Sequence, residues 1–412
     1  MFQIDLKSAK TIYDQVIENF TRLISAKLLS PGEKIPSIRE TAIMLTVNPN
    51  IIKKAYFELE HQGLFYTEQG KDWFVSSDSV KGGIYGRIQA DIRELILRGD
   101  DRANIGQLLG MEEKSYIKIE KLHKYFDDLI ALEDFNMNIQ KGSIYGLAGV
   151  NGSGKTTVVK HLAGLYQQDE GRARIAGFDA YDNAHQEVIG YMPEELYFLP
   201  QYTMNMLRKF FANKHKDSWN NRRYEHLLDM FGLDDEQKIN TFSSGMQKQA
   251  GFIFAISAMP DILLLDETID GLDPIVRKHV FRQIIADVAT RQMTVVVTSH
   301  NMKELDGICD TVGIINEGHM VVERDLDEIK ARLHKIHVAF RPETLSQLNP
   351  YQGLDVLHYD EMGFISILVV RGNEADIAKH IKSFNPTMYE YMPMSLEEIF
   401  IYERSGDEDD ED

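Results

Sequence analysis

The sequence predicts a multidomain protein with an N-terminal α+β domain, a central α/β domain and a small C-terminal α+β domain. Its 412 residues are too many for one ordinary hydrophobic core. The first 76 residues alternate helical periodicity with turn signals. Two short, mainly apolar segments in the middle, IYGLAG at 144–149 and ILLLDE at 262–267, are typical of buried parallel strands.

Composition and charge limit the class of protein. The chain is 43% apolar and 26% charged, as in soluble globular proteins. Its net charge of −19 argues against a protein whose whole surface is basic and binds nucleic acid. Residues 1–76 nevertheless hold nine basic and nine acidic residues, and the acidic excess lies downstream, ending in DEDDED at 407–412. We expect residues 403–412 to form a disordered acidic tail.

Cysteine content and hydropathy indicate the compartment. Cys309 is the only cysteine of the sequence, which excludes an internal disulfide and suits a reducing cytosol. The first residues lack the apolar core of a signal peptide, and the longest apolar run, at 250–259, is shorter than the ~18 residues of a membrane span. We therefore expect a cytoplasmic protein, free or held at the inner face of the cell membrane by a partner.

Residues 1–76 predict a winged helix-turn-helix. A first helix within 11–29 has one apolar face, and Pro31-Gly32 ends it. Ser37 and Glu40 form a capping-box pattern for a second helix that reaches Leu45. Asn48 caps a third, with Pro49 at its first position and a glycine closing it. LFYT and WFVS around the turn EQGKD predict a hairpin, or wing.

The third helix is predicted to contact DNA. Its apolar positions leave Asn50, Lys53, Lys54 and Phe57 facing outward, and groove-reading helices use their N-terminal half. The segment IPSIRETAIMLTVNPNIIKKAYFELEHQGLFYT resembles GntR-type winged helices, above all the YtrA branch, over about residues 8–76. The resemblance implies DNA contacts by six residues: Ser37, Arg39, Asn48, Asn50, Lys53 and Lys71.

Two departures from that family lower the expected affinity for DNA. Ile51 stands where the family often has a phosphate-binding Thr, and the wing at 68–72 is not a basic, glycine-rich turn. Phosphate neutralisation supplies much of the affinity of a protein for DNA. We therefore expect modest, salt-sensitive binding to an operator by a dimer.

Residues 77–115 form a connector with a helix whose apolar side chains recur at helical spacing from Ile84 to Ile96. In the YtrA branch the equivalent helices pair two subunits, which favours a dimerisation segment here. A spacer helix packed on its own chain remains the alternative.

The central domain carries a phosphate-binding loop. The strand IYGLAG runs directly into Gly149-x4-Gly154-Lys155-Thr156, the P-loop spacing. Backbone N–H groups of such a loop surround a phosphate, the lysine neutralises its oxygens, and the Thr156 hydroxyl is a ligand for Mg²⁺. The predicted nucleotide contacts are Gly149, Asn151, Gly152, Ser153, Gly154, Lys155, Thr156 and Thr157.

The second half of the nucleotide site follows the strand ILLLDE. Its end delivers Asp266 to the magnesium ion and Glu267 to the attacking water. ATP and Mg²⁺ are therefore the predicted cofactors, and Lys155 and Glu267 are predicted catalytic residues.

The motif FSSGMQKQ at 242–249 resembles the signature of ABC transporter ATPases, and the resemblance covers about residues 116–325. By that resemblance Tyr125 stacks on adenine, and His300 of the sequence TSH supports Glu267 in catalysis. Residues 270–273 match the family's D-loop. Three residues are implied to act in trans on the nucleotide of the other subunit of a homodimer: Ser243, Gly245 and Asp273.

Two positions depart from the ABC pattern. Glu194 stands where a Gln usually senses magnesium, so we assign it to the metal shell together with Thr156 and Asp266. The signature reads Ser-Ser-Gly-Met in place of Ser-Gly-Gly-Gln, which predicts a weaker contact in trans. Both departures concern the rate of hydrolysis and leave ATP binding intact.

Residues 326–402 predict four strands and two helices, the last helix opened by a Ser395/Glu398 capping box. Similar modules that end in SLEEIF follow the ATPase of export-type family members. No catalytic constellation is present in this segment of the sequence, so a structural or regulatory role is the expectation.

Three functions compete. In the first, the chain energises an exporter through a separately encoded membrane-spanning subunit and regulates its own operon. In the second, it is a nucleotide-sensing transcriptional regulator with no transport role. A mechanical ATPase acting on DNA or ribosomes is disfavoured because those relatives carry tandem ATPase units. The export-type C-terminal module and Glu267 favour the first function.

Overall fold

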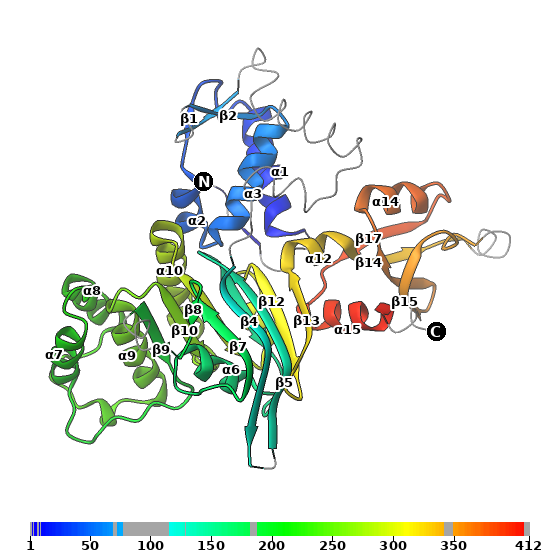
Figure 1. Cartoon of the computed structure of the whole chain (residues 1–412). Helices are drawn as coiled ribbons and strands as arrows, with labels where there is room; N and C mark the ends of the chain where they lie inside the picture. Colours follow the sequence, from blue (N-terminus) through cyan, green and yellow to red (C-terminus); the bar gives the residue numbers. More distant parts are fainter. Residues whose placement is uncertain are drawn as a thin grey trace. The chain divides into compact units, whose positions relative to one another are not determined.

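The computed structural model of the chain describes residues 2, 4–5, 8, 10–68, 72–76, 115–127, 129–181, 188–341 and 349–407. It divides into two compact units, Met1–Gln15 with Arg324–Asp412, and Val16–Glu323. Figure 1 labels their elements. Lys71 of the wing, residues 77–114 of the connector and residues 408–412 of the tail lie outside the described residues.

The N-terminal segment has the predicted winged helix-turn-helix fold. Its elements are α1 (Ile12–Ser25), β1 (Lys34–Ile35), α2 (Ile38–Leu45), α3 (Pro49–His61), β2 (Phe65–Glu68) and β3 (Asp72–Val75). The strands form an antiparallel sheet in the order β1-β3-β2. Tyr56 of α3 packs edge-on against Phe20, Phe65 and Trp73, with ring centroids 5.2–5.5 Å apart. Edge-to-face aromatic contacts of this kind stabilise a small core beyond the area they bury.

The central domain is built on a six-stranded sheet in the order β13-β12-β6-β11-β10-β9. Strands β12, β6, β11, β10 and β9 run parallel. Their bounds are β6 (Ile144–Ala148), β9 (Ile189–Met192), β10 (Ile262–Asp266), β11 (Thr294–Ser299), β12 (Thr311–Asn316) and β13 (His319–Asp325). Because parallel strands end at one edge, the residues that follow β6, β10 and β11 are brought together there.

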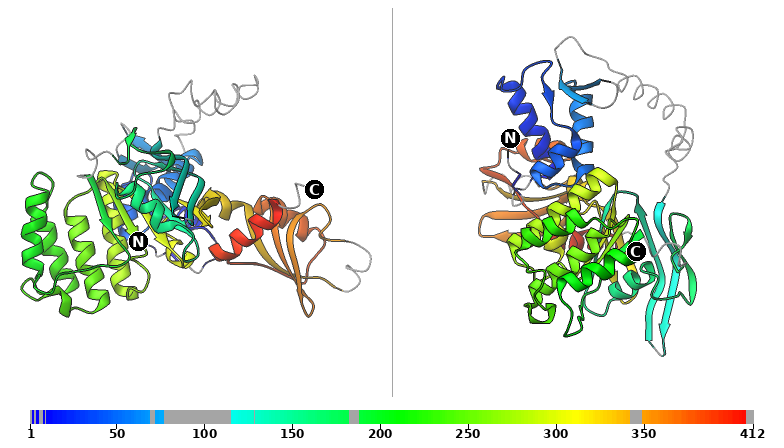
Figure 2. Two further views of the ribbon diagram at one scale, coloured as in Figure 1. Left: turned by 60° about the horizontal axis from the view of Figure 1, so that its bottom comes forward. Right: turned by 90° about the vertical axis from the view of Figure 1, so that its left-hand side faces the viewer.

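Helices surround this sheet: α6 (Lys155–Leu162), α7 (Met204–Lys214), α8 (Asn221–Phe231), η2 (Ile239–Thr241), α9 (Ser244–Ser257), α10 (Pro274–Arg291) and α11 (Met302–Leu305). Figures 1 and 2 show α7, α8 and α9 as a separate helical group next to β9. Aromatic rings join this group: Phe211 of α7 stacks on Phe254 of α9 with centroids 5.1 Å apart.

A second, antiparallel sheet covers the P-loop strand. It comprises β4 (Ser115–Phe126), β5 (Leu129–Gln140), β7 (Glu170–Ile175) and β8 (Phe178–Asp179) in the order β5-β4-β7-β8. One hydrophobic core joins it to α6 and to the parallel sheet, and includes Ile119, Phe135, Leu147, Val158 and Leu264. This shared core fixes the strand that carries the P-loop.

The C-terminal domain contains α12 (Leu326–Arg332), β14 (Leu333–Ala339), β15 (Asp355–Met362), β16 (Ile365–Arg371), α14 (Glu374–Lys382), β17 (Met388–Met392) and α15 (Leu396–Asp407). Its antiparallel sheet has the order β15-β16-β14-β17, which confirms the predicted strands. The predicted Ser395/Glu398 capping box is present. Helix α15 continues to Asp407, so the expectation of disorder from residue 403 is wrong for residues 403–407. The helix that the capping box begins extends past the apolar residues into the charged segment.

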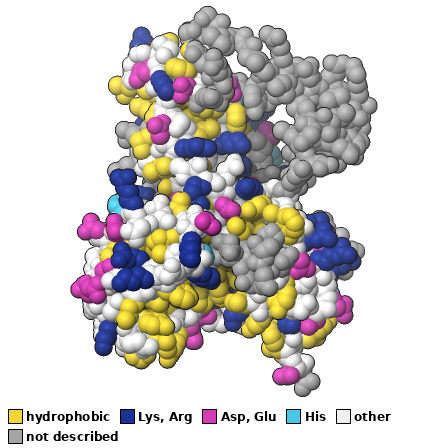
Figure 3. Space-filling view, turned by 60° about the vertical axis from the view of Figure 1, so that its left-hand side comes forward, with side chains coloured by type: hydrophobic (Ala, Val, Ile, Leu, Met, Phe, Trp, Pro, Cys, Tyr) yellow, Lys and Arg dark blue, Asp and Glu magenta, His cyan; other side chains and the backbone are white. Residues whose placement is uncertain are grey.

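Charged and apolar side chains are mixed on the surface. On the face shown in Figure 3, Lys and Arg side chains stand in separate groups between hydrophobic and uncharged side chains. Among the described residues, none of the helices combines the length and the apolar character that crossing a membrane requires.

Candidate functional site

The P-loop joins the buried strand β6 to helix α6. Two glycines are required by the geometry. A side chain at Gly149 would place its Cβ 2.4 Å from the carbonyl oxygen of Ile315, and Gly154 has φ +112°, a conformation that L-residues with side chains rarely adopt. Gly154 also precedes the first turn of α6, whose free N–H groups favour an anion. Exposed Asn151 and Gly152 complete the open side of the loop.

Lys155 lies inside this loop. Its side chain is 3% exposed, and Nζ donates to the carbonyls of Gly149 (2.8 Å) and Val150 (3.0 Å). The ammonium also pairs with Oε1 of Glu267 at 2.9 Å. The lysine is therefore held by backbone carbonyls and by the predicted catalytic carboxylate, at the position where phosphate oxygens are expected.

The predicted magnesium ligands meet at the edge of the sheet. Asp266 ends β10 and is fully buried, and its Oδ1 accepts hydrogen bonds from Thr156 (3.2 Å) and Thr298 (2.8 Å). Burial raises the pKa of this carboxyl, against hydrogen bonds that lower it. Its Oδ2 and the hydroxyl of Ser153 in the P-loop have no hydrogen-bond partner among the described residues. Buried oxygen atoms without partners are unusual, and here they fit Mg²⁺ and a phosphate.

Glu267, the predicted general base, follows Asp266 in the chain. Burial opposes ionisation of its carboxyl, but hydrogen bonds from Lys155 and His300 outweigh burial and lower the pKa. Nδ1 of His300 lies 3.0 Å from Oε2 of Glu267 and 3.1 Å from Oδ2 of Asp270. The hydroxyl of Ser299 lies within hydrogen-bond distance of both Asp270 oxygens and fixes this aspartate, which contacts the same ring nitrogen of His300 as Glu267 does.

Glu194 lines the same pocket, of about 380 Å³, as Glu267 and His300. This pocket also contains Lys248 and Asp270, neither of which the sequence singled out as a site residue. The ligand atoms of Glu267, Asp270 and His300 lie within 4.8 Å of one another, so their geometry is compatible with a cation. Lys155 and the His300 ring already bind Glu267, which favours a catalytic role for this cluster over a metal site.

Two of the three residues predicted to act in trans, Ser243 and Asp273, cap helices of their own chain. Ser243 is exposed and its hydroxyl accepts from the N–H of Met246, at the start of α9. A Cβ added at Gly245 would meet nothing within 4 Å, so this helix end is open. Asp273 caps α10 by accepting from the N–H of Ile275 at 2.9 Å. Their predicted contacts in trans stay predictions.

Tyr125 lies near the end of β4 with 40% of its surface exposed. Its N–H donates to Oδ2 of Asp169 at 2.7 Å, which fixes the backbone, and its ring stacks on His123. The exposed ring leaves room for a base to stack. Thr157, also predicted in the nucleotide site, lies in α6, where its carbonyl bonds the ring of His161.

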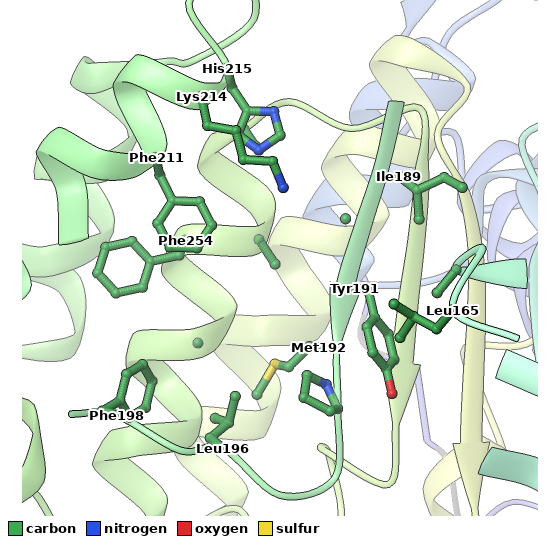
Figure 4. A pocket seen from close by; sticks show the side chains of 16 residues that line it. Leu165, Ile189, Tyr191, Met192, Leu196, Phe198, Phe211, Lys214, His215 and Phe254 are labelled. Carbon is green, nitrogen blue, oxygen red and sulfur yellow. The ribbon is translucent and has the colours of Figure 1, made fainter. Parts of the chain in front are cut away.

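A separate apolar pocket of about 370 Å³ lies between β9 and the helical group. Figure 4 shows aromatic side chains of α7 and α9 on one side and residues of β9 on the other, with Lys214 and His215 at one end. Its lining includes Tyr191, Met192, Leu196, Phe198, Phe211 and Phe254. The sequence did not reveal it, because its residues come from four separate segments of the chain, 163–165, 189–198, 211–215 and 251–258.

The predicted DNA contacts divide into two groups. Arg39 and Lys53 are exposed. Ser37 caps α2 and takes part in the predicted capping box. Asn48 caps α3 and is fully buried, and its amide donates to the carbonyl of Ile308 at 2.9 Å. Asn50 donates to the carbonyl of Gly142 at 3.2 Å.

Ile51, where the related family often has a phosphate-binding Thr, is 5% exposed. Its apolar side chain is therefore buried and is not presented to a phosphate. This burial adds a physical reason for the expectation of weak phosphate contact at the head of α3.

Comparisons with known proteins agree with this geometry. Residues 132–270 match the ABC transporter family and residues 12–75 match bacterial regulatory proteins of the gntR family. The ABC transporter ATP-binding protein YtrB of Bacillus subtilis is 27% identical, covering 70% of this chain and 98% of its own. YdbJ, an uncharacterized ABC transporter ATP-binding protein of the same organism, is 31% identical, covering 69% and 94%. The bacitracin transport ATP-binding protein BcrA of Bacillus licheniformis is 32% identical, covering 59% and 79%.

The chain belongs to the family of ABC transporter ATP-binding proteins and carries an N-terminal domain of the gntR family. This confirms the fold class and the combination of domains that the sequence predicted.

Proposed function

We propose that this chain binds and hydrolyses ATP as a homodimer, energises an exporter through a separately encoded membrane subunit, and regulates transcription of its own operon. One observation carries the proposal. Lys155, Asp266 and Glu267 meet at one sheet edge, and Oδ2 of Asp266 is buried there without a partner among the described residues.

Binding would begin in the P-loop. Its N–H groups and Lys155 would hold the phosphates, and Tyr125 would stack on the base. Thr156 and Asp266 would hold Mg²⁺, which when bound offsets the charge of the phosphate oxygens. Lys155 would have to exchange Glu267 and the carbonyl of Gly149 for phosphate oxygens, which frees the carboxylate.

Hydrolysis would then use the freed carboxylate. Once Lys155 has turned to phosphate, the contact with His300 still favours the ionised form of Glu267, and the carboxylate would take a proton from water as the water oxygen bonds to the γ-phosphorus. The bond from that phosphorus to the bridging oxygen breaks, and ADP leaves with its electron pair. His300 holds the carboxylate in place through its 3.0 Å contact.

A homodimer would complete the site. The exposed Ser243 and the open surface at Gly245 place the first turn of α9 where a second subunit could approach. That end of the helix has free N–H groups and a positive dipole end suited to a γ-phosphate. Asp273 would contribute from the start of α10.

The apolar pocket beside β9 is our candidate for docking of the membrane subunit. It lies on the same domain as the nucleotide site, and an apolar lining with a basic end suits a partner helix with an acidic terminus. Leu165 at this pocket is 55% exposed, so Leu165→Glu should weaken co-purification with a membrane protein encoded beside this gene. Leu28→Glu, at 70% exposure in the winged helix, is the matched control.

The discriminating experiment combines four measurements: ATP binding, phosphate release with Mg²⁺ and ATP, binding to DNA upstream of its own operon, and that co-purification. Positive results in all four support the proposal. ATP and DNA binding without turnover or a membrane partner would establish the alternative, a nucleotide-sensing regulator. The absence of both turnover and ATP binding would refute the proposal and the alternative together.

A further inference from the structure

The backbone that carries the catalytic carboxylate is strained. Glu267 has φ +47°, in the left-handed region, although it is not a glycine. Side chains disfavour this backbone conformation, so the surrounding contacts must maintain it. On one side, its N–H donates to the hydroxyl of Thr298 at 3.0 Å.

On the other side, a lysine of the signature helix holds the same segment. Nζ of Lys248 in α9 donates to the carbonyl of Glu267 at 3.3 Å and to that of Asp270 at 2.8 Å. Its ammonium therefore spans the turn between the predicted base and the aspartate that contacts His300. Hydrogen bonds from a charged donor are about twice as strong as neutral ones.

The other cation at this carboxylate is not permanent. Lys155 binds the side chain of Glu267, and this contact must open when Lys155 turns to phosphate. Lys248 binds the backbone carbonyls of this segment and not the carboxylate, so release of the Glu267 side chain leaves the contacts of Lys248 intact. Lys248 is thus the lysine that can keep the segment in place during hydrolysis.

We infer that Lys248 is a positioning residue for ATP hydrolysis, tying helix α9 to the carbonyls of Glu267 and Asp270 and so directing the Glu267 carboxylate. The inference rests on the proposed ATP hydrolysis. It has a consequence for the dimer, because α9 begins at Ser243 and Gly245. If a nucleotide held by the partner subunit moves this end of α9, the movement would also shift Glu267 of the subunit to which α9 belongs.

The first test is steady-state kinetics of three variants. Lys248→Met keeps the length of the side chain and removes the ammonium, and should lower kcat about 10-fold while KM for Mg²⁺-ATP changes less than twofold, because a misplaced base affects the chemical step. Lys248→Arg should restore at least half of kcat. Lys209→Met removes an exposed lysine of the same helical group and should match the wild type.

The second test does not need turnover. Hydrogen exchange in nucleotide-free protein should be faster in peptides covering residues 262–275 of Lys248→Met, and unchanged there in Lys209→Met. Wild-type kcat together with wild-type exchange in Lys248→Met would overturn the inference. A lower kcat accompanied by faster exchange throughout the chain would also overturn it, by showing general destabilisation.

The two tests separate this inference from the proposed function. A wild-type protein without turnover would refute the proposed hydrolysis and the catalytic role of Lys248 with it. The exchange result would still decide whether Lys248 holds the segment: faster exchange confined to residues 262–275 supports the tie, and unchanged exchange overturns it.

Discussion

The ammonium of Lys155 lies 2.9 Å from Oε1 of Glu267, and the two side chains are only 3% and 10% exposed. The cation of the P-loop and the predicted general base thus neutralise each other in this structure. Phosphate oxygens must compete with the carboxylate for the lysine. In the proposed function, nucleotide binding and release of the base are therefore one event.

Removing the charge of Glu267 should separate ATP binding from hydrolysis. Glu267→Gln should lower kcat by at least about 100-fold, because the water loses its base. Its affinity for ATP should equal or exceed that of the wild type, because the amide competes less for Lys155. Fluorescent-nucleotide titration and phosphate release measure the two effects.

The complementary variant, Lys155→Ala, should lose both ATP binding and turnover, since the loop loses its cation. Normal hydrolysis by Glu267→Gln would show that another group is the base. Wild-type ATP affinity in Lys155→Ala would show that the loop binds phosphate without its lysine.

The carboxyl of Asp310 should make the free energy of unfolding depend on pH. Burial raises the pKa of Asp310 from 3.8 to about 6, although hydrogen bonds from Ile144, Asn48 and Asn50 oppose the shift. Because the folded-state pKa is higher, the stabilisation is complete below pH 3.8 and is lost as pH rises through about 6. The wild type should thus gain about 1 kcal/mol between pH 7.5 and pH 5 relative to Asp310→Asn.

Denaturant unfolding of both proteins at the two pH values measures this difference. Asparagine keeps an acceptor for the N–H of Ile144, which Oδ2 of Asp310 binds at 2.7 Å. An identical pH dependence of the two proteins would exclude Asp310 as its source.

The exposed basic residues of the winged helix should set its affinity for DNA. Lys53→Ala and Arg39→Ala should each weaken operator binding about 3- to 10-fold and reduce the salt slope by about 1, as expected for loss of one phosphate contact. Lys27→Ala, at an exposed site after α1, is the control. Fluorescence titration at several salt concentrations gives both quantities, and unchanged binding in both variants would remove α2 and α3 from the DNA interface.

Nucleotide and DNA should affect each other's binding. The amides of Asn48 and Asn50 donate to carbonyls of Ile308 and Gly142, so any contact of these amides with DNA requires those bonds to open. ATP should therefore change operator affinity, typically by about 5- to 150-fold, and DNA must change ATP affinity by the same factor.

The experiment measures operator affinity of Glu267→Gln without nucleotide, with ADP and with ATP, and repeats it with Ser243→Arg to block closure of the dimer. Equal affinities in all states would show that the two domains act independently. A nucleotide effect that survives Ser243→Arg would place the signal within one subunit.

The sequence by itself predicted the combination of domains and the residues of the proposed nucleotide site. The winged helix follows from a capping box at Ser37 and a proline at the start of α3, which are local signals. The P-loop and the strand that ends at Asp266 follow from glycine spacing and from an apolar run. Such features can be predicted because backbone conformation and burial of a strand are encoded by neighbouring residues.

Only the tertiary structure decided which groups meet. Lys248 lies 19 residues from Glu267 in the chain and donates to its carbonyl, and Asn48 donates to Ile308, 260 residues away. Neither contact has a local pattern, because each depends on how strands and helices from separate segments of the chain pack against one another. For the same reason the sequence identified Lys155 and Glu267 individually, while their pairing required the fold.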